Sequence, residues 1–339
     1  MKPGSGTLEI HTSPHISSGI GTDMIMRHVV YALLPTAIFA VVAFGLAGLA
    51  TITAAVASCV ITEHVLCRLN GRESTVGDWS VAITGLLYGL TLPPGLPIWM
   101  TVAGGVIAVA LGKFMFGGLG QNPFNPALVG RAVIQAAFPV SLTTWTPAFS
   151  ADRFAALPSS TLAFPFTTPV YDAVSGATPL SAAKFDGVIT PINDLAFGFI
   201  SGSTGETSAV LILLGGAYLV YRNFMNWRIP ASIFVTVAVL SQLMHFISPD
   251  RYPDALFMLL SGGLMLGAVF MATDMVASPM TPKGVVVYGA LIGTLVVVIR
   301  YWGGLPEGVM YAILLGNAVS PHIDRLIRPR VYGTKRQEA

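Results

Sequence analysis

The sequence predicts an all-α polytopic membrane protein with about ten transmembrane helices, arranged in two inverted repeats that contain broken helices. Hydrophobic residues make up 53% of the chain and charged residues only 10%, whereas soluble domains carry about 25% charged residues. Several uncharged runs approach the roughly 20 residues that a bilayer-spanning helix needs. The 36 glycines and 23 prolines are typical of membrane helices that pack closely or break.

The apolar segments divide the chain into five parts. The segments that we expect to span the lipid bilayer are 29–49, 51–69, 78–92, 98–116, 127–140, 207–221, 229–247, 255–273, 284–299 and 309–323. They define an N-terminal segment 1–26, a first repeat 27–140, a polar loop 141–206, a second repeat 207–324 and a basic tail 325–339. The third segment stops at Pro93-Pro94, because two adjacent prolines cannot continue a helix.

Basic residues predict the orientation of the chain. If both termini are cytoplasmic, all but four of the 18 lysines and arginines lie on the inner side, which agrees with the positive-inside rule. The four on the outer side are Arg153, Lys184, Arg251 and Arg300. We therefore expect the loop 141–206 to lie outside the cytoplasm. Because the net charge is only +2 and the basic residues sit in short loops, nucleic acid is not an expected partner.

Two stretches, 78–131 and 254–325, share an order of features. Each begins with an aspartate, continues through a glycine-rich short span and a proline-broken stretch, and ends with a Gly-Asn or Gly-Gln-Asn sequence before another proline. Five spans separate the two stretches, and an odd number makes them cross the membrane in opposite directions. Inverted repeats with paired broken helices indicate a transporter-like fold with a site near the middle of the membrane.

The polar loop contains the stretch on which the functional prediction depends, Asp172-Ala173-Val174-Ser175-Gly176-Ala177-Thr178-Pro179-Leu180. Serine, glycine and proline within a few residues favour a turn. The Thr178 hydroxyl has small neighbours and is expected to be exposed, so that a second enzyme can esterify it. Considered by itself, the pattern is also that of an ordinary loop.

The pattern Asp172-x-x-Ser175-Gly176-Ala177-Thr178 resembles the flavinylation motif of the NqrB/RnfD family of membrane redox subunits. The resemblance implies that Thr178 carries FMN through a phosphoester bond. It also implies that Asp172, Ser175, Gly176 and Ala177 are recognised by a flavin-attaching transferase, and that riboflavin binds noncovalently in the membrane portion. The chain length resembles that of the RnfD type.

The same resemblance implies a membrane subunit of an ion-translocating electron-transport complex of the Rnf type, which couples electron transfer between ferredoxin and NAD to Na⁺ or H⁺ translocation. Such a chain is one subunit of a translocase, without a complete active site of its own. The implied partners are a second FMN-bearing subunit and iron–sulfur subunits. The implied location is the bacterial inner membrane, with the Thr178 loop in the periplasm. The alternative function is a small-solute channel or secondary transporter of urea-channel-like fold without redox chemistry.

Polar residues within or near the spans are candidates for an ion pathway. Glu63, Arg131 and Asp274 are such residues, and structural pairing is the alternative for each. Asn122, Asn125 and Asn317 adjoin the helix breaks, where backbone groups need partners or a cavity. We expect these three amides either to line that cavity, which includes an ion-pathway role for Asn122, or to cap the broken helices.

The remaining chemistry-bearing residues do not predict a metal site. Cys59 and Cys67 lie in one apolar span eight residues apart, too far for a disulfide within a helix, and are expected to be buried free thiols. The alternative is half of an iron–sulfur site shared with another chain. The six histidines lack the facing pairs that a haem site needs. A dinucleotide motif and a P-loop are both absent from the sequence, so we expect another subunit to collect the electrons.

Overall fold

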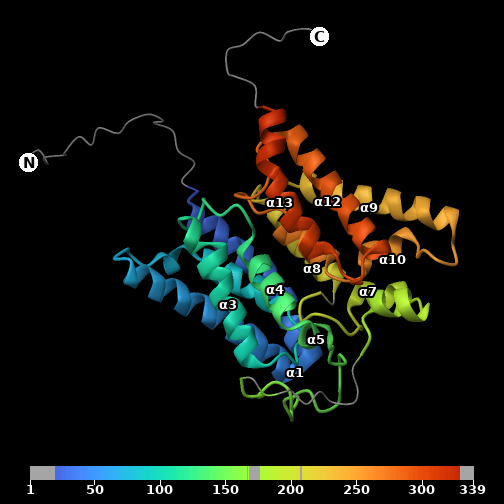
Figure 1. The fold of residues 1–339 in the computed structure, drawn as a ribbon, viewed down its shortest axis with the longest axis horizontal. Coiled ribbons are helices and arrows are strands. Elements are labelled where there is room, and N and C mark those ends of the chain that lie inside the picture. Colours follow the sequence, from blue (N-terminus) through green and yellow to red (C-terminus); the bar gives the residue numbers. More distant parts are fainter. Residues whose placement is uncertain (1–19, 166, 168–175, 207, 329–339) are drawn as a thin grey trace, which may run out of the picture.

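The computed structural model describes residues 20–165, 167, 176–206 and 208–328. The predicted positions Asp172 and Ser175 lie outside these residues. Within the described residues every regular element is a helix, and the one bridge between extended residues joins Trp145 and Gly176. The prediction of an all-helical membrane protein is confirmed (Figure 1).

The first repeat contains four α-helices and two short 3₁₀ helices. They are α1 (Thr22–Leu69), η1 (Thr75–Asp78), α2 (Ser80–Leu90), α3 (Ile98–Gly112), η2 (Phe114–Phe116) and α4 (Pro126–Ala137). Helix α1 includes both of the first two predicted spans, because it continues through a sharp bend at Gly45, where φ is 63° and ψ is −137°. Its two halves return to the same side of the molecule, since Met26 and Lys113 line one cavity and Lys113 also binds Glu63.

Residues of the polar loop fill the bend in α1. The Phe149 N–H donates to the Ala43 carbonyl at 2.8 Å, and the Leu46 N–H donates to the Arg153 carbonyl at 2.9 Å. The Arg153 guanidinium adds a bond to the Val42 carbonyl at 2.9 Å. These contacts satisfy backbone groups that the bend exposes, so the bend is stabilised by residues about one hundred positions further along the chain.

The loop itself carries short helices: α5 (Pro139–Thr143), α6 (Pro179–Ser181), the π-helix η3 (Ala182–Asp186) and α7 (Ile192–Phe197). Lys184 connects it to the second repeat, because its ammonium donates to the Arg300 carbonyl at 2.8 Å and to the Gly303 carbonyl at 2.5 Å. These acceptors lie at the C-terminal end of a helix, where a positive charge is favourable.

The second repeat contains α8 (Ala209–Tyr221), α9 (Arg228–Ile247), α10 (Ala255–Leu260), α11 (Leu264–Leu266), the π-helix η4 (Gly267–Met271), α12 (Pro282–Trp302) and α13 (Val309–Leu326). The predicted eighth span is broken between α10 and α11, at Gly262 with a φ of 62°. The sequence predicts one continuous span over 255–273, so the break at Gly262 differs from that prediction. The predicted break at 92–97 lies between α2 and α3, and the predicted break at 277–282 lies between η4 and α12 and reaches the first residue of α12.

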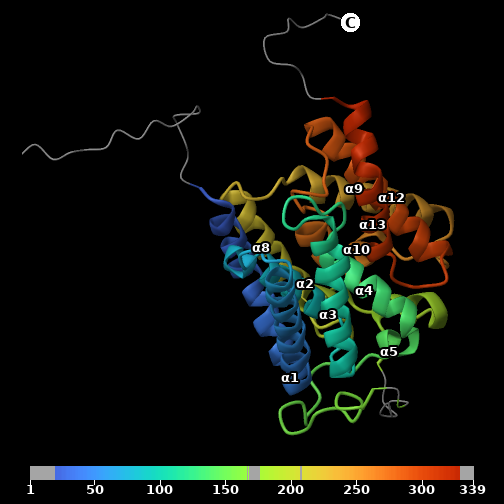
Figure 2. The ribbon, with the colours of Figure 1, turned by 60° about the vertical axis from the view of Figure 1, so that its left-hand side comes forward.

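The two repeats pack their helices in corresponding ways. Helix α3 packs against the second half of α1 and against α4, as α12 packs against α9 and α13. A glycine allows close approach in each case. A Cβ at Gly130 of α4 would lie 2.6 Å from the Gly104 carbonyl oxygen, and one at Gly316 of α13 would lie 2.8 Å from Ile292. Figure 2 shows the first repeat, in blue to green, beside the second, in yellow to red.

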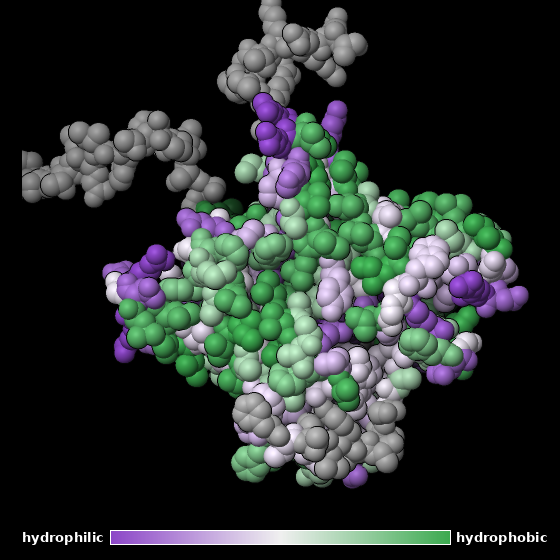
Figure 3. Space-filling view, viewed as in Figure 1, coloured by the Kyte–Doolittle hydropathy of each residue, from purple (hydrophilic) through white to green (hydrophobic). Residues whose placement is uncertain are grey.

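Apolar side chains cover the outside of the helices. On α9, Val235, Val239 and Leu243 recur every four residues and are 62%, 52% and 52% exposed. A row of exposed aliphatic residues on one face is suited to lipid. Figure 3 shows a broad hydrophobic surface with charged residues near its margins. Among the described residues four helices, including the bent α1, are long and apolar enough to cross a membrane.

Candidate functional site

Gly176, Ala177 and Thr178 lie at the edge of a cavity formed by the polar loop and the two repeats. The Gly176 N–H donates to the Trp145 carbonyl at 2.9 Å. Thr178 precedes α6, and its hydroxyl accepts a bond from the Ser181 N–H at 3.2 Å. The residue is only 2% exposed. The expectation of an exposed hydroxyl is therefore wrong for the folded chain, in which the hydroxyl caps α6 and the residue is buried.

The cavity beside Thr178, called here the Thr178 cavity, has a volume of about 320 Å³. Its lining combines apolar and aromatic side chains with a few polar groups, the usual composition of a site for an organic cofactor. The lining residues are Arg131, Gln135, Leu142, Thr143, Trp145, Gly176, Ala177, Thr178, Ser181, Phe185, Gly304, Leu305, Pro306 and Glu307.

Arg131, on α4, binds two carboxylates at the floor of the Thr178 cavity. Its Nη1 donates to Glu206 Oε1 at 3.0 Å, and its Nη2 donates to Glu307 Oε2 at 3.1 Å. Glu206 precedes α8 and Glu307 precedes α13, so this ion cluster joins the two repeats. The alternative of structural pairing is thus the observed one for Arg131. Burial, and then the charge of Glu206, raises the pKa of Glu307 to about 7.

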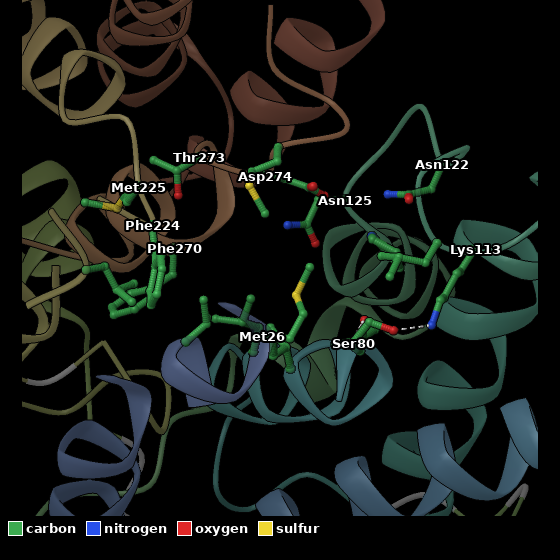
Figure 4. A pocket seen from close by; sticks show the side chains of 18 residues that line it. Met26, Ser80, Lys113, Asn122, Asn125, Phe224, Met225, Phe270, Thr273 and Asp274 are labelled. Atoms are coloured by element: carbon green, nitrogen blue, oxygen red, sulfur yellow. Dashed lines mark hydrogen bonds between the residues drawn. The ribbon is translucent and has the colours of Figure 1, made fainter. Parts of the chain in front are cut away.

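A second cavity, of about 110 Å³, lies near the opposite end of the helices and is called here the Asn cavity. Figure 4 shows Phe224, Met225 and Phe270 on one side of it and Asn122 and Asn125 on the other. The remaining lining residues are Met26, Val29, Ser80, Ile83, Thr84, Leu87, Lys113, Leu119, Pro126, Leu219, Thr273, Asp274 and Met275. The segment before α4 and the segment after η4 both contribute to this cavity.

Asn125 both caps a helix and connects the repeats. Its Oδ1 accepts from the Ala127 N–H at 3.0 Å, which caps α4, and its Nδ2 donates to the Met271 carbonyl at 3.3 Å. With the amide nitrogen of Asn317 turned toward Tyr288, the Asn317 oxygen accepts from the Asn125 N–H at 3.2 Å. For Asn125 the two predicted alternatives, capping and lining a cavity, are therefore both correct.

The other two predicted residues of this end are Asn122 and Asp274. The Asn122 amide donates to the Phe124 carbonyl at 3.1 Å, and its side chain interacts with the Asp274 carboxylate. Asp274 also accepts a bond from the Val276 N–H at 3.0 Å. Both residues line the Asn cavity, so the structure brings together two of the four ion-pathway candidates.

Glu63, like Arg131, is a candidate that the structure pairs elsewhere. Lys113 donates to its two oxygens at 2.9 Å and 2.7 Å, and the Thr75 hydroxyl donates at 2.5 Å. The carboxylate is 2% exposed and lines neither the Thr178 cavity nor the Asn cavity. For Glu63, as for Arg131, the structure therefore shows structural pairing, which was the alternative to an ion-pathway role.

Sequence reasoning missed Glu307 and the role of Glu206. Glu307 follows Gly-Gly-Leu-Pro between two spans, a pattern that reads as a short turn. The sequence did contain a signal for this pairing. Arg131 lies inside a predicted span and therefore needs a negatively charged partner, and Glu206 and Glu307 each lie at an outer boundary of a span. Cys59 and Cys67 are buried and free, as predicted, and the described residues contain no cluster suited to a metal ion.

Comparison with known proteins identifies the family. The model of the NQR2, RnfD, RnfE family matches residues 9–333. This chain belongs to that family. It is 38% identical to the D subunit of the proton-translocating ferredoxin:NAD(+) oxidoreductase complex of Clostridium ljungdahlii, with 96% of each chain covered. It is 40% identical to the D subunit of the Na(+)-translocating ferredoxin:NAD(+) oxidoreductase complex of Acetobacterium woodii, over 96% of this chain and 95% of the relative.

A third relative, the D subunit of the ion-translocating oxidoreductase complex of Halorhodospira halophila, is 39% identical, over 97% of this chain and 96% of the relative. The family membership confirms the resemblance that the sequence motif indicated. Because relatives of similar identity are named for protons in one case and for Na⁺ in another, membership alone does not choose the ion.

Proposed function

We propose that this chain is the D-type membrane subunit of an Rnf-type complex, which couples electron transfer between ferredoxin and NAD to translocation of Na⁺ or H⁺. The near full-length similarity to subunits with such names supports the proposal. Electrons enter and leave through other subunits, which include iron–sulfur subunits and a second FMN-bearing subunit. The chain contributes a fixed cofactor position and part of the ion path.

The observation that carries the proposal is the position of Thr178, at the end of the Gly-Ala-Thr sequence and on the wall of a cavity of about 320 Å³. In this proposal a flavin-attaching transferase esterifies the Thr178 hydroxyl with FMN, and Asp172 and Ser175 belong to the sequence that the transferase recognises. FMN supplies the electron-carrying chemistry when it is attached.

The residues present fit a flavin in this cavity. Trp145, Phe185 and Leu142 offer apolar and aromatic surface for a flat ring, while Arg131 and Gln135 offer donors to its polar edge.

The side chain of Ser201 leaves no room for a Cβ at Gly176. A Cβ at Gly176 would lie 2.5 Å from the Ser201 hydroxyl, so a larger side chain would displace this stretch from the cavity wall. This steric limit gives a structural reason for the glycine in the motif, next to its proposed recognition by the transferase.

We propose the Asn cavity as the site of a noncovalent riboflavin. Phe224 and Phe270 provide an aromatic wall, and the side chains of Asn122 and Asn125, which are bonded to Phe124, Ala127 and Met271, form a polar wall opposite it (Figure 4). The two cavities lie at opposite ends of the interface between the repeats. Electrons and ions would then use one interface, with the ion path passing Asp274 and Asn122.

In the proposed orientation the protein lies in the bacterial inner membrane, with both termini in the cytoplasm and the Thr178 loop in the periplasm. The start of α1 and the end of α13 lie on one side of the molecule and α5 lies on the other (Figures 1 and 2). Arg153, Lys184 and Arg300 belong to the side of the polar loop, and their small number there supports this orientation.

In-gel fluorescence tests the flavin attachment. Expressed with its flavin-attaching transferase, the wild-type chain is expected to give an ultraviolet-excited flavin band in a denaturing gel, and its intact mass should include one FMN. Thr178→Ala should lose both signals, whereas Thr143→Ala, on the same cavity wall, should keep them. A flavin band in Thr178→Ala would contradict the assignment. Colourless, flavin-free protein would favour a solute channel instead.

A further inference from the structure

The ion cluster of Arg131, Glu206 and Glu307 does not satisfy all of its own polar atoms. Arg131 Nε, Glu206 Oε2 and Glu307 Oε1 are buried and have no hydrogen-bond partner within the described part of the chain. The side chains of Arg131 and Glu206 are 8% and 4% exposed, and that of Glu307 is 17% exposed. Leaving a buried carboxylate oxygen without a hydrogen-bond donor costs free energy. A proton or a positively charged group bound to either oxygen would remove this cost.

The cluster separates two spaces along the interface between the repeats. Arg131 and Glu307 line the Thr178 cavity on one side. Together with Glu206 they also line a smaller cavity of about 20 Å³, which extends past Gly263 toward Met271. A space of this size holds roughly one water molecule. The ion cluster therefore lies between the Thr178 cavity and this smaller cavity.

The charges around Glu307 come from three elements. Arg131 of α4 binds both glutamates, and Arg300 of α12 donates to the carbonyls of Met258, at 2.5 Å, and Ser261, at 2.8 Å. Lys184 of η3 is directed at the backbone carbonyls of Arg300 and Gly303. Arg300 thus adds its field to the cluster without a direct bond to either carboxylate.

This balance favours a proton over a metal cation. Two guanidinium groups face two carboxylates, so the cluster is neutral when both glutamates are ionised. A hard metal cation binds through several oxygen ligands, and only two unpartnered carboxylate oxygens are available here, next to two positive groups. A proton needs one of them.

We propose that Glu307, held beside Glu206 by Arg131, is a proton-binding site that takes up one proton when the cofactor on Thr178 is reduced. The coupling rests on the proposed function, whereas proton binding by Glu307 does not. An electron passes from a reduced iron–sulfur or flavin centre of another subunit to the cofactor. A proton from water then forms an O–H bond at Glu307 Oε1. When the electron leaves, this O–H bond breaks and the proton is released.

Linkage makes the effect reciprocal. Added negative charge in the Thr178 cavity raises the affinity of Glu307 for a proton, and a proton on Glu307 raises the tendency of the cofactor to accept an electron. Arg131 acts here as a positioning residue, because it holds the two carboxylates together and lies between them and the cavity.

Infrared spectroscopy tests proton binding without the cofactor. The full-length chain in detergent, as the Thr178→Ala variant, is expected to have a protonated-carboxyl C=O band that disappears as the pH rises through neutrality. The band should be absent when Glu307→Gln is added and present when the exposed Glu73→Gln is added instead. Because Glu307→Gln removes a charge from a buried cluster, Glu307→Asp is the second variant, and it should retain a band that titrates at a shifted pH. If neither the Thr178→Ala parent nor the Glu307→Asp variant has a titrating band, the assignment of Glu307 as a proton-binding site is wrong.

Redox titration of the flavinylated protein tests the coupling. The midpoint potential of the flavin should fall with pH around neutrality, and Glu307→Gln should lessen this dependence by about one proton per electron, whereas Glu73→Gln should leave it unchanged. An identical dependence in Glu307→Gln would overturn the coupling even if the infrared band is present. Failure of flavin attachment at Thr178 is detected separately by the gel assay, so the two proposals can fail independently.

Discussion

Lys113 donates to both oxygens of Glu63, at 2.9 Å and 2.7 Å, in a pair whose side chains are only 5% and 2% exposed. Removing one member of a buried ion pair leaves the other charge uncompensated, at a cost of about 3–5 kcal/mol. We therefore predict that Glu63→Gln lowers the free energy of unfolding by this amount, measured by thermal or denaturant unfolding in detergent. The double variant Glu63→Gln/Lys113→Met should recover most of the loss.

The same experiment distinguishes the two interpretations of Glu63. A stable Glu63→Gln protein that has lost ion transport in the assembled complex would contradict the structural role and support an ion pathway. Glu73→Gln, at an exposed position, serves as the control and should change neither quantity.

Gly45 and Gly71 have nearly the same φ, 63° and 64°. A Cβ at Gly45 would overlap the Arg153 carbonyl, whereas a Cβ at Gly71 meets nothing within 4 Å. We predict that Gly71→Ala costs about 1 kcal/mol of stability, from left-handed strain alone. Gly45→Ala should cost clearly more, because the Gly45 ψ of −137° lies outside the left-handed helical region and because the loop segment that fills the bend is also displaced. Equal losses in unfolding experiments would contradict both the backbone strain at Gly45 and the contact with Arg153.

Stability should depend on pH through Glu307. Its pKa is raised from 4.5 to about 7 by burial and by Glu206, so the folded chain binds the proton more tightly than the unfolded chain does. Stability contributed by this group is present below pH 4.5 and is lost as the pH rises toward 7, by about 1 kcal/mol per pH unit. Glu307→Gln should flatten this part of the stability profile in thermal unfolding at a series of pH values. An unchanged profile would contradict the raised pKa.

Filling the Asn cavity should displace the proposed noncovalent flavin. Val29 lines this cavity, while Val106 of α3 is 40% exposed on the outer surface. We predict that Val29→Trp reduces the flavin released on denaturation, measured by its absorbance, and leaves the covalent band on the gel intact. Val106→Trp is the matched control and should retain the released flavin. Full retention in Val29→Trp would place riboflavin elsewhere.

Cysteine labelling tests the proposed orientation. Cys59 and Cys67 are 0% and 3% exposed, so the native chain should react little with a membrane-impermeant maleimide. Phe164→Cys in the polar loop, at a position 78% exposed, should be labelled in spheroplasts. Leu69→Cys, at a position 76% exposed at the C-terminal end of α1, should be labelled only after lysis. The opposite pattern would invert the orientation.

The positions of the helices follow from local information. Uncharged runs end where charges, prolines or glycines begin, and most predicted spans lie within a few residues of α-helices in the structure. The division of the first two spans is predicted near position 50, whereas the bend occurs at Gly45. The sequence around Gly45 is uniformly apolar. The bend depends on bonds to Phe149 and Arg153, and such distant contacts leave no local pattern.

The candidate site is predictable only where a motif marks it. Thr178 can be found from the sequence around it, but its burial cannot, because the cap to Ser181 and the packing of the loop depend on the fold. Glu206 and Glu307 lie about one hundred residues apart in different span boundaries, and the fold brings them to Arg131. Pairing of this kind depends on how the two repeats pack against each other. The sequence predicts the order of the spans, but it does not predict that packing.

The inward-facing hydroxyl of Thr178 has a consequence for biogenesis. A transferase has little access to a residue that is only 2% exposed, so under the proposed function modification precedes the docking of residues 176–181 onto the membrane helices. A nascent polypeptide that docks this segment too early would remain permanently without its cofactor. The fraction of chains that carry the cofactor would then depend on the rate of flavin attachment relative to the rate at which residues 176–181 dock, and slower docking would give a larger fraction.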